Sequence, residues 1–146
     1  MTKATEIKDL SIGDLARRTE TKVQTIRYYE EIGLLPAPTR TGGNQRVYGE
    51  GSLRRLAFIR HARDLGFGID AVRDLLRLSD HPEQACDDAD EIARRHLVEV
   101  EDRLKRLRSL RNELKRMVDC HHGGSIADCR VIEVLSDHGL CAHRQH

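Results

Sequence analysis

Residues 11–33, SIGDLARRTETKVQTIRYYEEIG, contain the pattern that decides the fold. Ser11 and Asp14 form the S-x-x-D signature of a helix N-terminus, and an apolar stripe at helical spacing follows it. After a short break, a second helix is predicted over Lys22–Glu31, with Thr21 as its cap. Two short helices joined by a tight turn predict a helix-turn-helix.

A turn-rich segment follows the second helix. Gly33 stands where a glycine commonly ends a helix. Residues 35–44 contain two prolines and the turn Gly42-Gly43-Asn44, so they do not continue as a helix. Residues 46–48, Arg-Val-Tyr, suit a short strand after this turn. The segment therefore predicts a two-stranded wing.

Two further helices complete the first domain. Apolar residues at helical spacing predict helices over residues 52–65 and 69–78, with a glycine-containing break between them. Asp80-His81-Pro82 then interrupts the pattern. We therefore predict a winged helix-turn-helix domain that binds DNA and spans residues 9–80.

A long helix is predicted over residues 87–119, where the sequence has neither proline nor glycine. Its apolar residues recur at alternating spacings of three and four, which is the pattern of a coiled coil. They are Ala93, Leu97, Val100, Leu104, Leu107, Leu114 and Val118, with Arg111 as the polar exception. A small domain offers too little surface to cover such a stripe, so a homodimer is the stronger hypothesis. The alternative is a helix that folds back on its own domain.

Composition narrows the classes of function. Aromatic residues make up 3% of the 146 residues and charged residues 34%, which argues against an enzyme with a large core and a deep pocket. Residues 1–80 contain 14 Lys+Arg and 11 Asp+Glu, a difference of +3, whereas the remainder contains 11 and 13, a difference of −2. The first half is therefore better suited to a polyanion. The sequence shows no long apolar run and no secretory leader, so we expect a cytoplasmic protein without a membrane partner.

Polar side chains that suit DNA gather on the predicted winged helix-turn-helix. Arginine and lysine suit phosphates and guanine, glutamine and threonine suit base edges, and tyrosine suits backbone oxygens. The candidates are Arg17, Arg18, Lys22, Gln24, Thr25, Arg27, Tyr28, Arg46 and Tyr48. Each alone would be an ordinary surface residue, but the set on this motif predicts a DNA-binding surface.

These motifs resemble those of the MerR family of transcription regulators. The resemblance runs from about residue 9 to 135 and keeps the family's order of parts. The matching motifs are IGDLA at 12–16, TIRYYE at 25–30, GLLP at 33–36, NQRVY at 44–48, FIR at 58–60 and LGF at 65–67. It implies a mainly α fold with an N-terminal winged helix-turn-helix, a long dimerisation helix at 87–119 in an antiparallel coiled coil, and a short metal-binding loop and tail at 120–146.

The resemblance also implies a mechanism. A dimer would bind a pseudo-palindromic operator whose spacer between the two polymerase recognition elements is too long. Effector binding would distort this DNA so that RNA polymerase can use the promoter, a form of indirect readout. Arg17 or Arg18, Arg27, Tyr28, Arg46 and Tyr48 match positions that contact DNA in relatives, and Arg27, Tyr28 and Arg46 are the firmest of these.

Thiols and imidazoles flank the predicted long helix on both sides. Thiolate and imidazole are the ligands that borderline and soft cations prefer. The candidates are Cys86 before the helix, and Cys120, His121, His122, Cys129, Cys141 and His143 after it. In an antiparallel dimer, Cys86 of one subunit would join the loop of the other. The alternative for Cys86 or Cys129 alone is a small buried side chain.

The resemblance sharpens the choice of metal. Metal-sensing relatives carry a cysteine-containing loop that ends like Ala127-Asp128-Cys129. Copper(I) sensors have serine at the position of Cys86, whereas sensors of divalent ions have cysteine there. A divalent ion is therefore expected, with zinc first and cadmium, lead or mercury next, at an efflux or resistance promoter. The alternatives are copper(I)-responsive and thiol-redox-responsive regulators.

The third ligand has two candidates. When the long helix is aligned with that of metal-sensing relatives, His121 falls at the position of the first loop cysteine. When the loop is aligned instead by its spacing to Cys129, as in mercury sensors, Cys120 falls at that position. His122, Cys141 and His143 are either extra ligands, which would suit the zinc tetrahedron, or parts of a loose tail.

Overall fold

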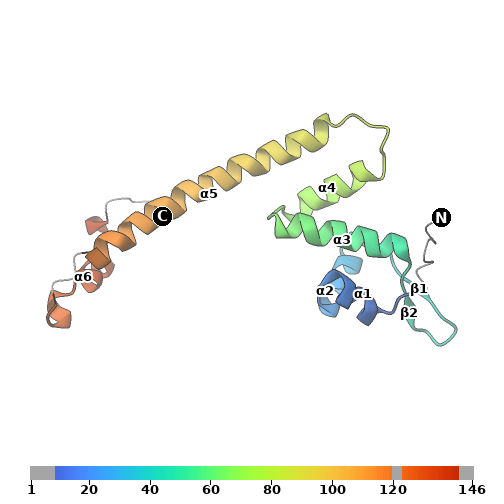
Figure 1. Ribbon diagram of the computed structural model, residues 1–146, viewed down its shortest axis with the longest axis horizontal. Coiled ribbons are helices and arrows are strands. Elements are labelled where there is room, and N and C mark those ends of the chain that lie inside the picture. Colours follow the sequence, from blue (N-terminus) through green and yellow to red (C-terminus); the bar gives the residue numbers. More distant parts are fainter. Residues whose placement is uncertain (1–8, 120–122, 142–146) are drawn as a thin grey trace, which may run out of the picture. The chain divides into compact units, whose positions relative to one another are not determined.

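The computed structural model describes residues 9–119 and 123–141, and it confirms the mainly helical fold (Figure 1). In chain order the elements are α1 (Ile12–Thr19), α2 (Val23–Glu31), β1 (Thr39–Arg40), β2 (Arg46–Val47), α3 (Glu50–Asp64), α4 (Ile69–Ser79), α5 (Asp87–Asp119), η1 (Ile126–Asp128), α6 (Arg130–Ser136) and η2 (His138–Leu140). The chain divides into two compact units between Ala89 and Asp90. Within the described ranges, no helix is long and apolar enough to cross a membrane.

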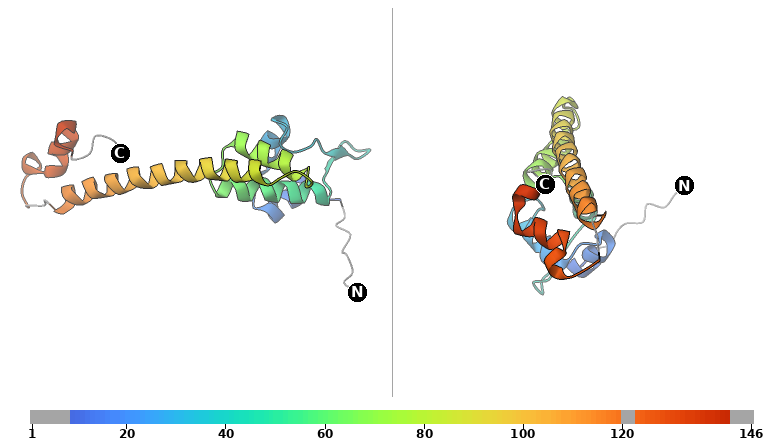
Figure 2. Two further views of the ribbon diagram at one scale, coloured as in Figure 1. Left: turned by 90° about the horizontal axis from the view of Figure 1, so that it is seen from above. Right: turned by 90° about the vertical axis from the view of Figure 1, so that its left-hand side faces the viewer.

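One apolar core holds α1 to α4 together. Leu15, Ile26, Leu56, Ile59 and Val72 are all 0% exposed, and every one of the four helices contributes at least one of them. Burying a side chain of this size contributes roughly 1.5–3 kcal/mol relative to leaving it in water. The four helices therefore gather around a shared centre, with the strand hairpin at their edge (Figure 2).

The junction between α1 and α2 confirms one predicted cap and corrects another. The Ser11 hydroxyl accepts a hydrogen bond from the Asp14 N–H at 3.1 Å, and the Asp14 carboxylate accepts one from the Ser11 N–H at 3.3 Å. The predicted capping box is therefore present. The prediction that Thr21 caps α2 is wrong, because the cap residue is Lys22, which makes no side-chain cap bond. The Thr21 hydroxyl donates instead to the carbonyl of Thr19, at the end of α1.

The wing is a short antiparallel hairpin. Thr39 pairs with Val47 across it, and Asn44 adopts the left-handed conformation in its turn, with φ 63°. The strand predicted over residues 46–48 is one residue shorter, because Tyr48 leaves β2 and forms a bridge with Leu10 through two hydrogen bonds of 2.8 Å. The N-terminal segment thus ties the wing to the helical core.

The ends of the neighbouring helices follow their glycines. Gly33 has φ +77° and follows Ile32, the C-cap of α2, as expected for a glycine at this position. The helix predicted from residue 52 begins two residues earlier, because Gly49 acts as the N-cap of α3 and its carbonyl accepts from the Leu53 N–H.

The helix α5, most of which lies in the second unit, is one unbroken helix with the predicted bounds. The apolar stripe along it stays uncovered within the single chain. The large members Leu97, Leu104, Leu107, Leu114 and Val118 are 46–66% exposed. The stripe is therefore left available to a partner.

The second unit also contains a helix that the sequence did not predict. Residues 120–146 suggested a loop and a tail, but α6 forms within this range. Such a short helix is unstable alone, and the burial of Val134 at 2% exposure accounts for it.

Candidate DNA-binding surface and metal ligands

The predicted contact residues of α2 share its solvent side. Lys22, Gln24, Arg27 and Tyr28 are exposed and Thr25 is half-buried, while Ile26 and Tyr29 turn into the core. Arg17 and Arg18 are exposed in the last turn of α1. The described chain therefore brings seven of the nine predicted DNA contacts onto the outer surface of the helix-turn-helix.

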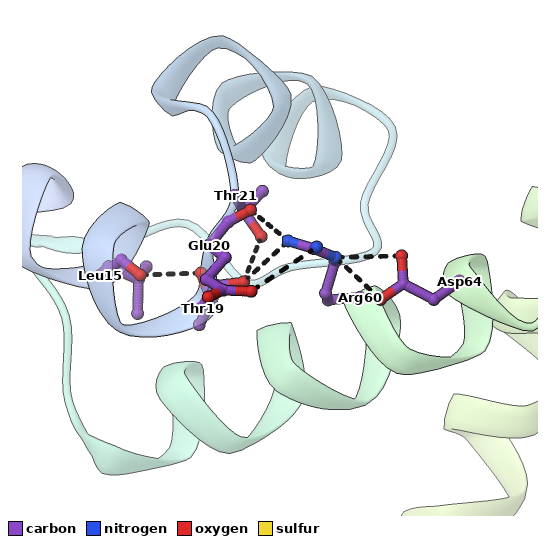
Figure 3. A network of polar contacts seen from close by, with 6 residues as sticks. All are labelled: Leu15, Thr19, Glu20, Thr21, Arg60 and Asp64. Atoms are coloured by element: carbon purple, nitrogen blue, oxygen red, sulfur yellow. Dashed lines mark hydrogen bonds and ion pairs between the residues drawn. The ribbon is translucent and has the colours of Figure 1, made fainter.

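The turn between these two helices is held by a residue that the sequence analysis missed. The guanidinium of Arg60 in α3 donates to the carbonyl of Thr19 at 3.1 Å and also to the carbonyl of Glu20 (Figure 3). Its Nε donates to both carboxylate oxygens of Asp64, at 3.0 and 3.1 Å. Glu20 itself has φ 51°, a left-handed conformation that is uncommon outside glycine. Arg60 thus fixes the backbone at the point that sets the angle between α1 and α2.

The other end of α2 is held in the same way. Arg55 Nε donates to the Leu34 carbonyl at 2.8 Å, and Arg73 Nη1 donates to the Ile32 carbonyl at 2.9 Å. Arg55 also pairs with Asp80 at 3.1 Å. No pattern in a single sequence marks such arginines, because their partners are backbone carbonyls distant along the chain.

The last two predicted contacts lie in the wing and are placed differently. The side chain of Arg46 is 29% exposed, and its Nη2 lies 3.8 Å from Glu30 Oε2. Tyr48 is 1% exposed, and its hydroxyl donates to Glu30 Oε1. Tyr48 is therefore a core residue, and its contact with DNA stays a prediction. Glu30, which the sequence analysis also missed, thus contacts both wing side chains.

The tyrosine hydroxyl is a fixed donor. Burial raises the pKa of Tyr48 above its ordinary value. The hydrogen bond to Glu30 and the charge of that carboxylate raise it further. The hydroxyl therefore stays protonated at neutral pH and donates to the carboxylate.

The described candidate metal ligands lie in both units. Cys86 is exposed just before α5, in the first unit, whereas Cys129 and Cys141 are half-buried on either side of α6, in the second. Within residues 9–119 and 123–141, no three His, Cys, Asp or Glu side chains gather in a way that could hold a metal ion. Cys120, His121, His122 and His143 lie outside the described residues. The donor types fit a soft or borderline cation.

Comparison with known proteins identifies the family. Residues 10–79 match the family described as "MerR HTH family regulatory protein", and residues 53–117 match "MerR, DNA binding". The HTH-type transcriptional regulator ZntR of Escherichia coli K12 is 40% identical over 127 residues, which cover 85% of this chain and 90% of ZntR. The chain belongs to the MerR family. It is accordingly a DNA-binding transcription regulator.

Solved structures of the family have the same fold. The transcription regulator PbrR691 from Ralstonia metallidurans CH34, in complex with lead(II), is 36% identical, with a TM-score of 0.74, covering 86% of this MerR-family chain and 98% of PbrR691. The regulator MerR from Bacillus megaterium MB1, in complex with mercury(II), is 26% identical, with a TM-score of 0.66 and coverage of 87% and 99%. The relatives of this MerR-family chain thus include proteins solved with heavy-metal ions.

Proposed function

We propose that this MerR-family protein is a cytoplasmic homodimer that activates a metal efflux or resistance promoter when it binds a divalent cation. Zinc is the first choice, followed by cadmium, lead and mercury. On metal binding the dimer distorts its operator so that RNA polymerase can use the promoter. One observation carries this proposal. The helix α5 follows the DNA-binding unit in the chain, its apolar stripe is uncovered, and cysteines flank it on both sides in the sequence.

The exposed stripe supports the dimer. Five large apolar side chains between Leu97 and Val118 remain about half exposed on one chain, and a contiguous apolar surface of this kind marks an interface. The spacing of three and four residues suits a second helix packed alongside. In an antiparallel pair, the start of one α5 lies beside the end of the other.

This arrangement supports a metal site shared between subunits. Cys86 precedes α5, and Cys129 follows it. An antiparallel pair would bring Cys86 of one subunit near Cys129 of the other. Cys120 or His121 would supply the third ligand, and His122, Cys141 and His143 are candidates for a fourth.

The test is metal titration of the reduced dimer against a competing chelator. Zinc, cadmium, lead, mercury and copper(I) are compared. Cys86→Ser and Cys129→Ser should each lower the affinity for divalent ions by about 100-fold or more, because removing a direct ligand costs more than the 10–100-fold typical of outer-shell partners. Cys120→Ser and His121→Gln then show which of these two residues is the loop ligand. Preference for copper(I), or reversible activation by oxidant without metal, would support the alternatives instead.

Mixed dimers test whether the site is shared. In a dimer of one Cys86→Ser chain and one Cys129→Ser chain, a shared site leaves one complete set of ligands. A site within each chain leaves none. The proposal therefore expects one tight site per mixed dimer and none in either parent variant. Equal loss in all three proteins would contradict the shared site, and a His61→Gln variant, which alters an imidazole of α3 outside the cluster, serves as the control.

A further inference from the structure

Glu30 is an unusual residue for its position in α2. It lies in the last turn of the helix, where the carbonyl ends of the backbone dipoles disfavour a negative charge. Its side chain is also only 10% exposed, and burying a carboxylate is costly unless it is paired and hydrogen-bonded. Both effects favour a neutral residue here, so the partners of Glu30 need an explanation.

Those partners both come from the wing. Tyr48 donates its hydroxyl to one carboxylate oxygen, and the guanidinium of Arg46 lies 3.8 Å from the other. Tyr48 is itself fixed, because its backbone bonds Leu10 in both directions. One carboxylate thus connects α2, the recognition helix with Arg27 and Tyr28 on its solvent side, to the strand end that carries the predicted wing contact.

The contact to Arg46 differs from the contact to Tyr48. A separation of 3.8 Å is an ion pair but too long for a hydrogen bond. Among the described residues, the buried Nε of Arg46 has no hydrogen-bond partner. The guanidinium is therefore held in place by charge, and its terminal Nη groups, unlike the buried Nε, can donate to another anion.

We propose that Glu30 is a positioning residue that holds Arg46 in register with the exposed face of α2, so that wing and recognition helix engage one stretch of DNA together. Glu30 itself touches no DNA. It acts by orienting a cation whose N–H groups then donate to a phosphate. This role rests on the wing contact of Arg46, which is part of the predicted DNA-binding surface.

The test compares Glu30→Gln with Glu31→Gln. Glu31 is exposed in the same turn of α2, so both variants remove one negative charge from almost the same place. Charge alone predicts that both variants bind any DNA more tightly. The glutamine oxygen at position 30 can still accept from Tyr48, but it no longer attracts Arg46.

The probes are a duplex selected from a random-sequence pool by the parent protein and a random-sequence duplex of equal length. Affinity is measured by fluorescence anisotropy over a series of salt concentrations. Glu30→Gln should bind the selected duplex about 5-fold more weakly, a typical coupling for a contacting pair, while its affinity for the random duplex is not reduced. Glu31→Gln should lose no affinity for either probe. If Glu30→Gln binds the selected duplex as tightly as Glu31→Gln, the proposal is overturned.

A second arm separates this proposal from the wing contact on which it rests. Arg46→Ala should weaken binding to the selected duplex and reduce its salt dependence, since it removes a phosphate contact. If it does neither, the wing contact itself is wrong. If it does, adding Glu30→Gln to Arg46→Ala should cause no further loss, and a persisting loss would show that Glu30 acts elsewhere. Should Glu30→Gln fail to fold, Glu30→Asp replaces it, because the shorter side chain keeps the charge but withdraws the carboxylate from Arg46. An unchanged preference for the selected duplex would then overturn the proposal.

Discussion

The two units of this protein differ in how far they bury their apolar residues within one chain. In the first, the side chains at the centre of α1 to α4 are fully buried within one chain, and arginines of α3 and α4 bind the carbonyls at both ends of α2. In the second, the regular stripe of α5 remains about half exposed. The difference indicates that the DNA-binding unit is complete in a single chain, whereas α5 is completed by a partner.

The largest effect on this difference between the two units is expected from a charge placed in the α5 stripe. We expect Leu107→Asp to convert the dimer to a monomer, because a symmetric interface would bury the new carboxylate twice and each unpaired burial costs several kcal/mol, about a 100-fold or larger rise in the dissociation constant. The affinity for operator DNA should fall as well, since each half of a palindromic operator binds one subunit of the dimer. Sedimentation velocity measures the change.

Its control is Val98→Asp, which places the same charge at a 65% exposed position of α5 outside the stripe. This variant should remain dimeric. In both variants the first unit should keep its thermal unfolding transition, because its core lies within one chain. Loss of that transition in Leu107→Asp, or equal dimerisation of the two variants, would contradict the proposed division of roles.

A smaller effect is expected inside the first unit, at Arg60. Arg60→Met removes the charged donors to the Thr19 and Glu20 carbonyls but keeps much of the apolar stem. Hydrogen bonds from charged groups contribute about 1.5–3 kcal/mol, and the partial exposure of Arg60 places the expected loss near the lower value. Urea unfolding measures it.

The matched control is Arg54→Met, which changes an exposed arginine of the same helix. It should alter stability by less than about 0.5 kcal/mol. If both variants unfold at the same urea concentration, Arg60 does not stabilise the α1–α2 turn, and the apolar core alone holds the first unit.

Local patterns predicted much of this fold. The capping box at Ser11, the glycine that ends α2 and the unbroken span of α5 all depend on residues close together in sequence. They are also fixed by backbone chemistry that acts over one or two turns. The structure therefore matches these predictions almost residue by residue.

The unpredicted features depend on contacts between distant residues. From the sequence alone, Tyr48 suits a strand residue that contacts DNA. Only the structure shows its backbone bridge to Leu10 and its hydrogen bond to Glu30. The formation of α6 depends on the burial of Val134 rather than on a local pattern. Whether Cys120 or His121 is the loop ligand stays a prediction, because alignment of the long helix with relatives favours His121 and alignment of the loop favours Cys120.

The smallest expected effect lies at the start of α1, and it is specific to pH. The hydrogen bonds from the Ser11 side chain and then its backbone, with the charge of Arg17, hold the pKa of Asp14 below its ordinary value. Ser11→Ala removes the first of these and should cost about 1 kcal/mol, as is typical for loss of an N-cap. Urea unfolding of the two proteins at neutral pH measures this difference.

The sign of the pH dependence follows from linkage. A carboxyl whose pKa is lower in the folded state stabilises the fold fully above its unfolded pKa, and this contribution disappears as pH falls through the folded pKa. The gap in unfolding free energy between the parent and Ser11→Ala should therefore be constant near neutral pH and narrow in acid. A gap that widens in acid would show that Ser11 stabilises the neutral form of Asp14. A gap independent of pH would show that the cap contributes through the Ser11 hydroxyl and the Asp14 N–H alone.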